Sequence, residues 1–180
     1  EQTAAIQEAA KDGDFVDQLL MVLLHTGLTA TEFTHMHGSW LEPLPSADAY
    51  EDATPIIRIP SEADCRGIQL GSNLEISQRT GRCGYCKDTG YEVWHPGKAG
   101  SDRRVRTIPI PDGTTVERLY WWFSRYESTP ISLTSLQQRL SQLADQAGLE
   151  RNITPRDLRA TYGTNLVRMG FSSEEITQLM

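Results

Sequence analysis

The chain has 180 residues, of which 38% are hydrophobic and 23% charged, and its formal net charge is −7. This length suffices for one globular domain with a buried core and is short for two, so we expect a single domain over residues 1–180. The acidic balance excludes nucleic-acid binding through bulk positive charge, which leaves only a local cluster of arginine and lysine for that purpose.

Targeting signals and cysteine usage indicate the compartment. No apolar stretch approaches the roughly 20 residues of a membrane span, and no basic-then-apolar leader precedes the first predicted helix. The three cysteines cannot all pair with one another, and two of them form Cys83-Gly-Tyr-Cys86. In a reducing compartment this spacing favours metal binding over disulfides, so we expect a cytoplasmic protein with no membrane partner.

Both ends of the chain are typical of a segment taken from a longer sequence. The first residue is Glu1 rather than methionine, and residues 174–180 have the pattern of a helix that is still in progress. We therefore expect the chain to be a truncated piece of a longer protein.

The N-terminal part is predicted to be helical. Residues 3–11 form an alanine-rich polar helix, and residues 15–24 carry enough apolar positions for a helix with a wide buried face, ending at Gly27. Thr29 and Glu32 have the spacing of a capping box, which predicts a short helix that continues to about Met36.

The middle of the chain predicts a small sheet. Residues 55–60 form a short strand between prolines, and residues 90–95 and 104–110 alternate as strands on either side of a turn at 96–102. We expect these to form a three-stranded antiparallel meander. Residues 61–89 have little periodicity, hold all three cysteines and are predicted to be an insert in the domain.

Helices return in the C-terminal part, at about 115–126, at 133–147 and from Thr154 onward. In the last of these Thr154 would cap, Pro155 would take the first turn and Asp157 would complement the helix dipole, while Gly148 and Gly170 would end helices. The predicted fold class is α+β and mainly helical, with the helices packed around the small sheet.

Cys65, Cys83 and Cys86 are the predicted ligands of a structural zinc ion, which needs a fourth ligand. His95 is the first candidate for that place, with Asp64 or Asp88 behind it. The alternative is that the thiols are buried and free. His35 and His37 lie two positions apart on a predicted helix, on different faces, and are expected to be packing or surface residues.

Three segments carry a resemblance to a known family. They are Leu24–Met36 (LHTGLTATEFTHM), Lys98 in a turn followed by Arg104–Ile110 (RVRTIPI), and Thr154–Leu166 (TPRDLRATYGTNL). In this order they resemble the tyrosine recombinases of the phage-integrase family, and in particular its haloarchaeal and archaeal-virus branch. The resemblance also supports the metal site, because related archaeal integrases often carry a cysteine-bearing insert with a C-G-Y-C element before the lysine hairpin.

The resemblance implies breakage and rejoining of DNA. In that reaction a tyrosine attacks a phosphodiester, paired arginines hold the charge of the transition state, and a lysine and a histidine move protons, without a metal or other cofactor. Arg159 matches the second arginine and Lys98 the hairpin lysine, whereas the first arginine position holds Thr29 and the histidine position holds Arg156. The attacking tyrosine would follow Met180, so this fragment is expected to be inactive in cleavage.

Double-stranded DNA is the implied partner, and self-association on DNA is a further expectation. The expected phosphate-binding residues are Lys98, Arg103, Arg104, Arg156 and Arg159. Ordinary alternatives stand beside these roles: Lys98 as a plain turn lysine, Arg159 as a helix-surface arginine, and Arg103 and Arg104, together with Arg106, as a solvated strand face.

Two aromatic features are predicted to belong to the core. Tyr162 lies too early in the chain to be the nucleophile, and most of the run Trp121–Phe123 should be buried, because three successive helix residues cannot share one face. The competing functions are a degenerate, non-cleaving DNA-binding relative and a zinc-stabilised interaction module.

Overall fold

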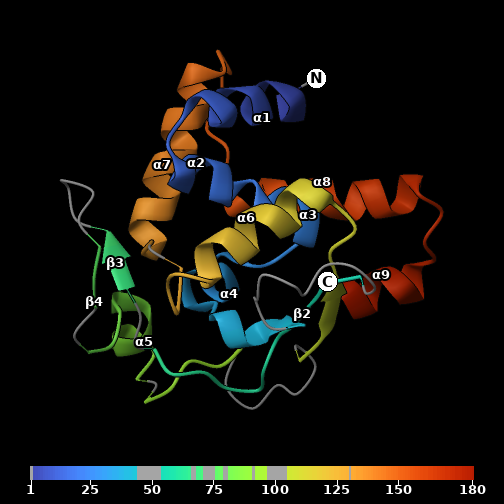
Figure 1. Cartoon of the computed structure of the whole chain (residues 1–180). Helices are drawn as coiled ribbons and strands as arrows, with labels where there is room; N and C mark the ends of the chain where they lie inside the picture. The colour runs from blue at the N-terminus through green and yellow to red at the C-terminus, as the bar shows by residue number, and fades with distance from the viewer. Residues whose placement is uncertain are drawn as a thin grey trace. The chain divides into compact units, whose positions relative to one another are not determined.

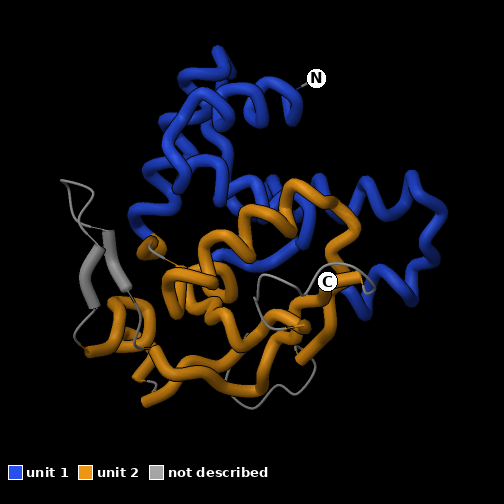
Figure 2. The backbone as a smooth tube through the Cα atoms, in the orientation of Figure 1, with its two compact units in different colours: residues 1–30, 134–180 blue, residues 31–133 orange. Residues whose placement is uncertain are grey.

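The computed structural model describes residues 2–43, 54–65, 68–70, 76–78, 81–90, 92–96, 105–129 and 131–180. The chain divides into two compact units, which are coloured in Figure 2. Unit 1 comprises residues 1–30 and 134–180, and unit 2 comprises residues 31–133. The single domain predicted over residues 1–180 stays a prediction.

Unit 1 is built from helices. They are α1 (Gln2–Asp12), α2 (Phe15–Leu20), α3 (Val22–Thr26), α7 (Leu133–Gln146, which begins one residue before the unit), α8 (Pro155–Arg168) and α9 (Ser173–Leu179), labelled in Figure 1 where there is room. The predicted helices at 3–11, 133–147 and from Thr154 onward are confirmed. The single helix expected over 15–24 is two helices, which meet at Met21.

Local signals define where these helices begin and end. The Thr154 side chain accepts from the Asp157 amide and the Asp157 side chain accepts from the Thr154 amide, so the cap predicted for α8 is confirmed. Gly27, Gly148 and Gly170 all have positive φ, at 60°, 67° and 89°, as expected of residues that end helices. Each of these devices depends on residues close together in the sequence, which is why the sequence predicts them.

The core of unit 1 includes the packing of α3 against α8. Leu23 and Leu158 are buried in these helices, and Tyr162, at 7% exposure, confirms its predicted place in the core. The ring of Tyr162 lies where a Cβ on Gly27 would be. Gly27 therefore serves both the left-handed turn and the close approach of α8.

Unit 2 combines short helices with short strands. Its elements are α4 (Ala30–His35, whose first residue belongs to unit 1), a 3₁₀ turn (Gly38–Trp40), β1 (Leu41–Glu42), β2 (Ile56–Arg58), β3 (Ile68–Leu70), β4 (Ile76–Gln78), α5 (Gly84–Asp88), β5 (Thr107–Pro109) and α6 (Gly113–Phe123), most of which are labelled in Figure 1.

The predicted three-stranded antiparallel sheet is present, but one of its strands differs. Its order is β1-β2-β5, with Leu41 opposite Ile57 and Ile57 opposite Ile108. The strand expected at 90–95 is wrong: in that segment Trp94 forms an isolated bridge with Ala63. Its place in the sheet is taken by β1, whose two residues are too few for a readable alternation.

The predicted cysteine-containing insert, residues 61–89, holds two elements that periodicity did not predict. One is the antiparallel pair of β3 and β4, and the other is the single turn of α5. Both are shorter than the windows in which periodicity is informative.

The aromatic run of α6 is mainly core, as predicted. Trp122 and Phe123 are buried, while Trp121 is 45% exposed and stacks on the guanidinium of Arg125. With this helix the described elements give a mainly helical protein with a small three-stranded antiparallel sheet, which confirms the predicted fold class. Among the described residues no helix has the length and apolar character needed to cross a membrane.

Candidate functional site

Arg159 brings two of the family-like segments together within unit 1. It lies on α8 and is half-buried, and its Nη1 donates a hydrogen bond to the backbone carbonyl of Gly27. Thr29, which occupies the position of the first arginine in the resemblance, follows two residues later. Two of the predicted catalytic positions therefore belong to one corner of unit 1.

The start of α8 carries charge of both signs. Arg156 is exposed there, and the Asp157 carboxylate accepts from the Thr154 amide at 2.9 Å. Hydrogen bonds from Thr154 hold the pKa of Asp157 below its usual range. Because Thr154 and Asp157 already occupy this helix end, its positive potential is partly neutralised from within the chain.

Three of the predicted phosphate-binding residues, Lys98, Arg103 and Arg104, lie outside the described residues. Arg106 is described, and neither of its sequence interpretations holds. Its side chain is 5% exposed, and Nη1 and Nη2 donate to the two carboxylate oxygens of Glu32 at 2.5 and 2.9 Å. It is neither a solvated strand residue nor a surface cation, because it is committed to a buried, bidentate ion pair in unit 2.

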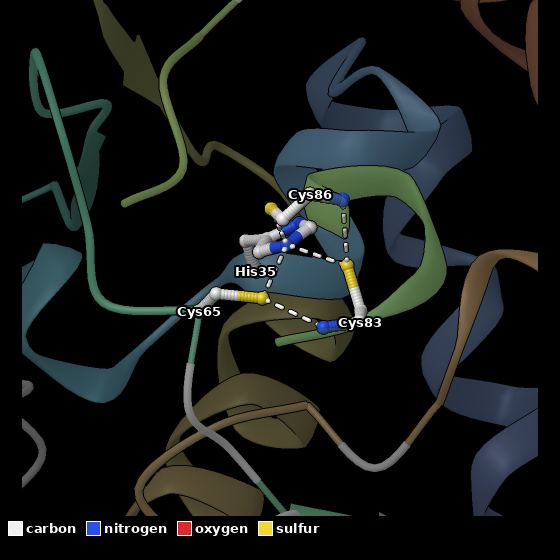
Figure 3. Close-up of side chains that lie close together, drawn as sticks. All are labelled: His35, Cys65, Cys83 and Cys86. Carbon is white, nitrogen blue, oxygen red and sulfur yellow. Dashed lines mark hydrogen bonds between the residues drawn. The ribbon is translucent and has the colours of Figure 1, made fainter. Parts of the chain in front are cut away.

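A cluster of His35 and all three cysteines lies in unit 2, and we call these four residues the thiol–imidazole cluster (Figure 3). His35 is the last residue of α4, Cys65 follows the Ala63–Trp94 bridge, Cys83 caps α5 and Cys86 lies within it. Their ligand atoms all lie within 4.8 Å of one another, so the cluster could hold a metal ion.

The fourth member of the cluster differs from the prediction. His95 was the first candidate, but its Nδ1 lies 3.2 Å from the carbonyl of Ser61, and the imidazole among the thiols belongs to His35. His35 had been expected to be a packing or surface residue. No local pattern identifies it, since it is 30 residues away from the nearest cysteine in the cluster.

The His35 ring is held from both of its nitrogens and from one face. Nδ1 lies 2.7 Å from the carbonyl of Thr31, and Nε2 lies 3.5, 3.4 and 3.5 Å from the sulfurs of Cys65, Cys83 and Cys86. Trp94 stacks on the ring, with centroids 5.2 Å apart. The ring is 2% exposed, so its orientation is set by the protein.

The three thiols have different acidities. Burial raises the pKa of Cys65 and of Cys86. Burial also acts on Cys83, but contacts with His35 and with the Cys86 amide outweigh it and lower the pKa of Cys83 to about 6. Cys83 is therefore the sulfur that most readily carries negative charge at neutral pH.

Comparison with known proteins gives a likeness in structure only. No protein-family model and no curated protein matches the sequence. The structure is similar to the crystal structure of XerA recombinase, with a TM-score of 0.62, 16% identity, and coverage of 99% of this chain and 52% of the other. It is also similar to the Tn1549 transposon integrase in complex with transposon right end DNA, with a TM-score of 0.60, 16% identity, and coverage of 99% and 54%.

A second structure of that integrase, in complex with a circular intermediate DNA, gives a TM-score of 0.58 at 15% identity, with coverage of 99% and 54%. The chain therefore spans about half the length of the structures it resembles. Since nearly all of this chain is covered in each comparison, its fold is the one found in these recombinase and integrase structures.

Proposed function

We propose that the chain is the DNA-binding part of a catalytic domain of the tyrosine-recombinase type. The observation that carries this proposal is the position of Arg159. The segment that resembles the family around the second arginine places Arg159 against Gly27, in the segment that resembles the family around the first. The likeness to an integrase in complex with DNA, over 99% of this chain, supports the same partner.

In this proposal Arg159 and Arg156 bind phosphate oxygens of the duplex. A guanidinium keeps its charge at every accessible pH and matches the geometry of phosphate, and the bond to Gly27 orients that of Arg159. Lys98, Arg103 and Arg104 would add further phosphate contacts from the segment around the predicted turn. Such local cations let a chain of net charge −7 bind DNA.

The same residues favour binding over cleavage. Thr29 has no charge to offer to a transition state, and Arg156 cannot exchange a proton near neutral pH as a histidine would. Strand cleavage would then be slow even in a longer chain that contains the attacking tyrosine. Self-association on DNA and membership of the haloarchaeal and archaeal-virus branch stay predictions from the sequence.

The test is duplex binding by fluorescence anisotropy over a series of salt concentrations, with Arg159→Ala and a matched control. Arg168→Ala is the control, because nine residues along the same helix turn its side chain to the opposite face, about 14 Å away. We expect Arg159→Ala to weaken binding to all sequences alike and to reduce the slope of log K against log salt by about one.

Arg168→Ala should leave affinity and slope close to those of the parent chain. Equal effects of the two substitutions would mean that Arg159 has no special place in the complex. Absence of duplex binding by a folded parent chain at low salt would refute the proposal and favour the protein-interaction module instead.

A further inference from the structure

We propose that His35, Cys65, Cys83 and Cys86 together bind one structural zinc ion, and that this ion fastens the cysteine-containing insert to helix α4. This inference does not rest on the proposed DNA binding. The inference replaces the ligand set expected from the sequence, because His35 takes the place of His95.

The first support is the hydrogen-bond capacity of the His35 ring. Nε2 of an imidazole has one donor or one acceptor position, yet three sulfurs lie 3.4–3.5 Å from it. Hydrogen bonds satisfy at most one of these contacts. One cation in the middle of the four atoms satisfies all of them together.

The second support is the size of the cluster. A tetrahedral zinc ion with Zn–N of about 2.0–2.1 Å and Zn–S of about 2.3 Å separates nitrogen from sulfur by roughly 3.5 Å. The three observed nitrogen–sulfur distances agree with that edge length. The largest separation within the cluster, below 4.8 Å, requires only a small inward movement of the sulfurs.

The third support is the environment of the ligands. Nδ1 of His35 faces the Thr31 carbonyl at 2.7 Å, and an N–H donated there leaves the lone pair of Nε2 directed at the thiols. The Cys83 amide donates to the sulfur of Cys65 at 3.2 Å, and the Cys86 amide donates to the sulfur of Cys83 at 3.5 Å. Amide donors of this kind stabilise thiolates.

Burial indicates a structural ion. His35, Cys65 and Cys86 are each at most 2% exposed, and Trp94 covers one face of the imidazole. Three thiolates and one imidazole complete a tetrahedron and leave no open position for water or substrate, which is the form of a structural zinc site. A soft, sulfur-rich donor set also disfavours magnesium and calcium.

The ion would connect parts of the chain that are far apart in the sequence. It ties His35 to residues 30, 48 and 51 positions further along. The elements described within the insert are short, namely the three-residue strands β3 and β4 and the five-residue α5. Metal binding would supply the stabilisation that these short elements lack.

Metal analysis of the whole chain, purified without chelator, is the first test. We expect one zinc ion per chain, and exchange for cobalt should give the absorption of a tetrahedral thiolate complex. Alkylation of the three cysteines should be slow until a chelator is added. Iron in place of zinc, or metal-free protein with freely reactive or oxidised thiols, would overturn the proposal.

The ligand set is tested by His35→Ala against the matched control His95→Ala. Substitution of residues that only hydrogen-bond to metal ligands lowers metal affinity by roughly 10- to 100-fold. His35→Ala removes a ligand itself and should lower zinc affinity by more than that, whereas His95→Ala should keep full zinc occupancy. Loss of zinc in His95→Ala with retention in His35→Ala would reverse the assignment. If His35→Ala does not fold, the alkylation of the wild-type chain still tests the proposal. Bound zinc must protect all three thiols from the alkylating reagent until a chelator is added.

Discussion

The two units differ in the length of their elements and in the burial of their long-range ion pairs. In unit 1 the helices begin and end on signals from neighbouring residues, such as the Thr154–Asp157 cap of α8 and the left-handed Gly27. In unit 2 the described strands are three residues long or shorter, and the conspicuous contacts join residues far apart, such as Arg106 with Glu32, 74 positions away. Unit 1 also has a long-range ion pair, Arg139 with Asp14, but that pair is partly exposed, whereas the pair of Arg106 and Glu32 in unit 2 is buried.

The largest effect is expected from breaking the buried ion pair of unit 2. Glu32→Gln leaves the Arg106 guanidinium buried without its counter-charge, which should cost about 3–5 kcal/mol of unfolding free energy in urea titration. Glu42→Gln is the matched control, because Glu42 also accepts two hydrogen bonds from an arginine, Arg58, but at the surface.

The surface pair should matter little, since water replaces it. Equal destabilisation by Glu32→Gln and Glu42→Gln would mean that the buried ion pair contributes no more to the free energy of unfolding than the surface pair does. A double substitution of Glu32→Leu with Arg106→Met should recover most of the loss, because no unpaired charge remains.

A somewhat smaller effect is expected at Gly27 in unit 1. Gly27→Ala places a Cβ in a left-handed residue and against the Tyr162 ring, so we expect a loss of roughly 2–4 kcal/mol in the same titration. Gly148→Ala is the control, because Gly148 has a φ of 67° but open space around its Cβ position. It should lose only the backbone part, roughly 1–2 kcal/mol.

The difference between the two glycines isolates the contact between the Gly27 turn and α8. If both substitutions cost the same, close packing of Gly27 on Tyr162 contributes nothing to the free energy of unfolding.

The smallest effect is expected at the cap of α8. Asp157→Asn should cost roughly 0.5–1 kcal/mol at neutral pH, because the carboxylate both caps the helix and complements its dipole. Since folding lowers the pKa of Asp157, its contribution is present above the unfolded-state pKa of about 3.9 and disappears as pH falls through the lower folded-state pKa. Thermal melting across this range should show the variant and parent curves converging in acid; curves that stay parallel would contradict the role of the charge.

Prediction from the sequence was most successful where neighbouring residues decide the structure. The caps at Thr154, Gly148 and Gly170 and the buried position of Tyr162 are read from short patterns. The strand predicted at 90–95 failed because alternation alone cannot show that Trp94 bridges to Ala63 and stacks on His35.

The candidate sites divide in the same way. The three cysteines were recognised by their type and spacing, while His35 was missed because nothing near it in the sequence indicates a thiol partner. Arg106 looked like its neighbours in a basic strand, and only the fold reveals that its partner, Glu32, lies in another element.

Helix α4 constrains how sequences of this kind can vary. Within its six residues, Glu32 forms the ion pair with Arg106 and His35 contacts the three thiols. These two residues, which we call the anchors, lie three positions apart on one short helix. Loss or gain of one residue between them would rotate one anchor by about 100° away from its partner. The segment between Cys65 and Cys83, in contrast, forms a loop whose two ends meet in the cluster. We expect insertions or deletions in this loop to cost little, because loop-closure entropy changes slowly with loop length. An alignment of relatives should therefore be anchored on a Glu-x-x-His pair after the Thr-Gly turn, with insertions and deletions accepted between the cysteines.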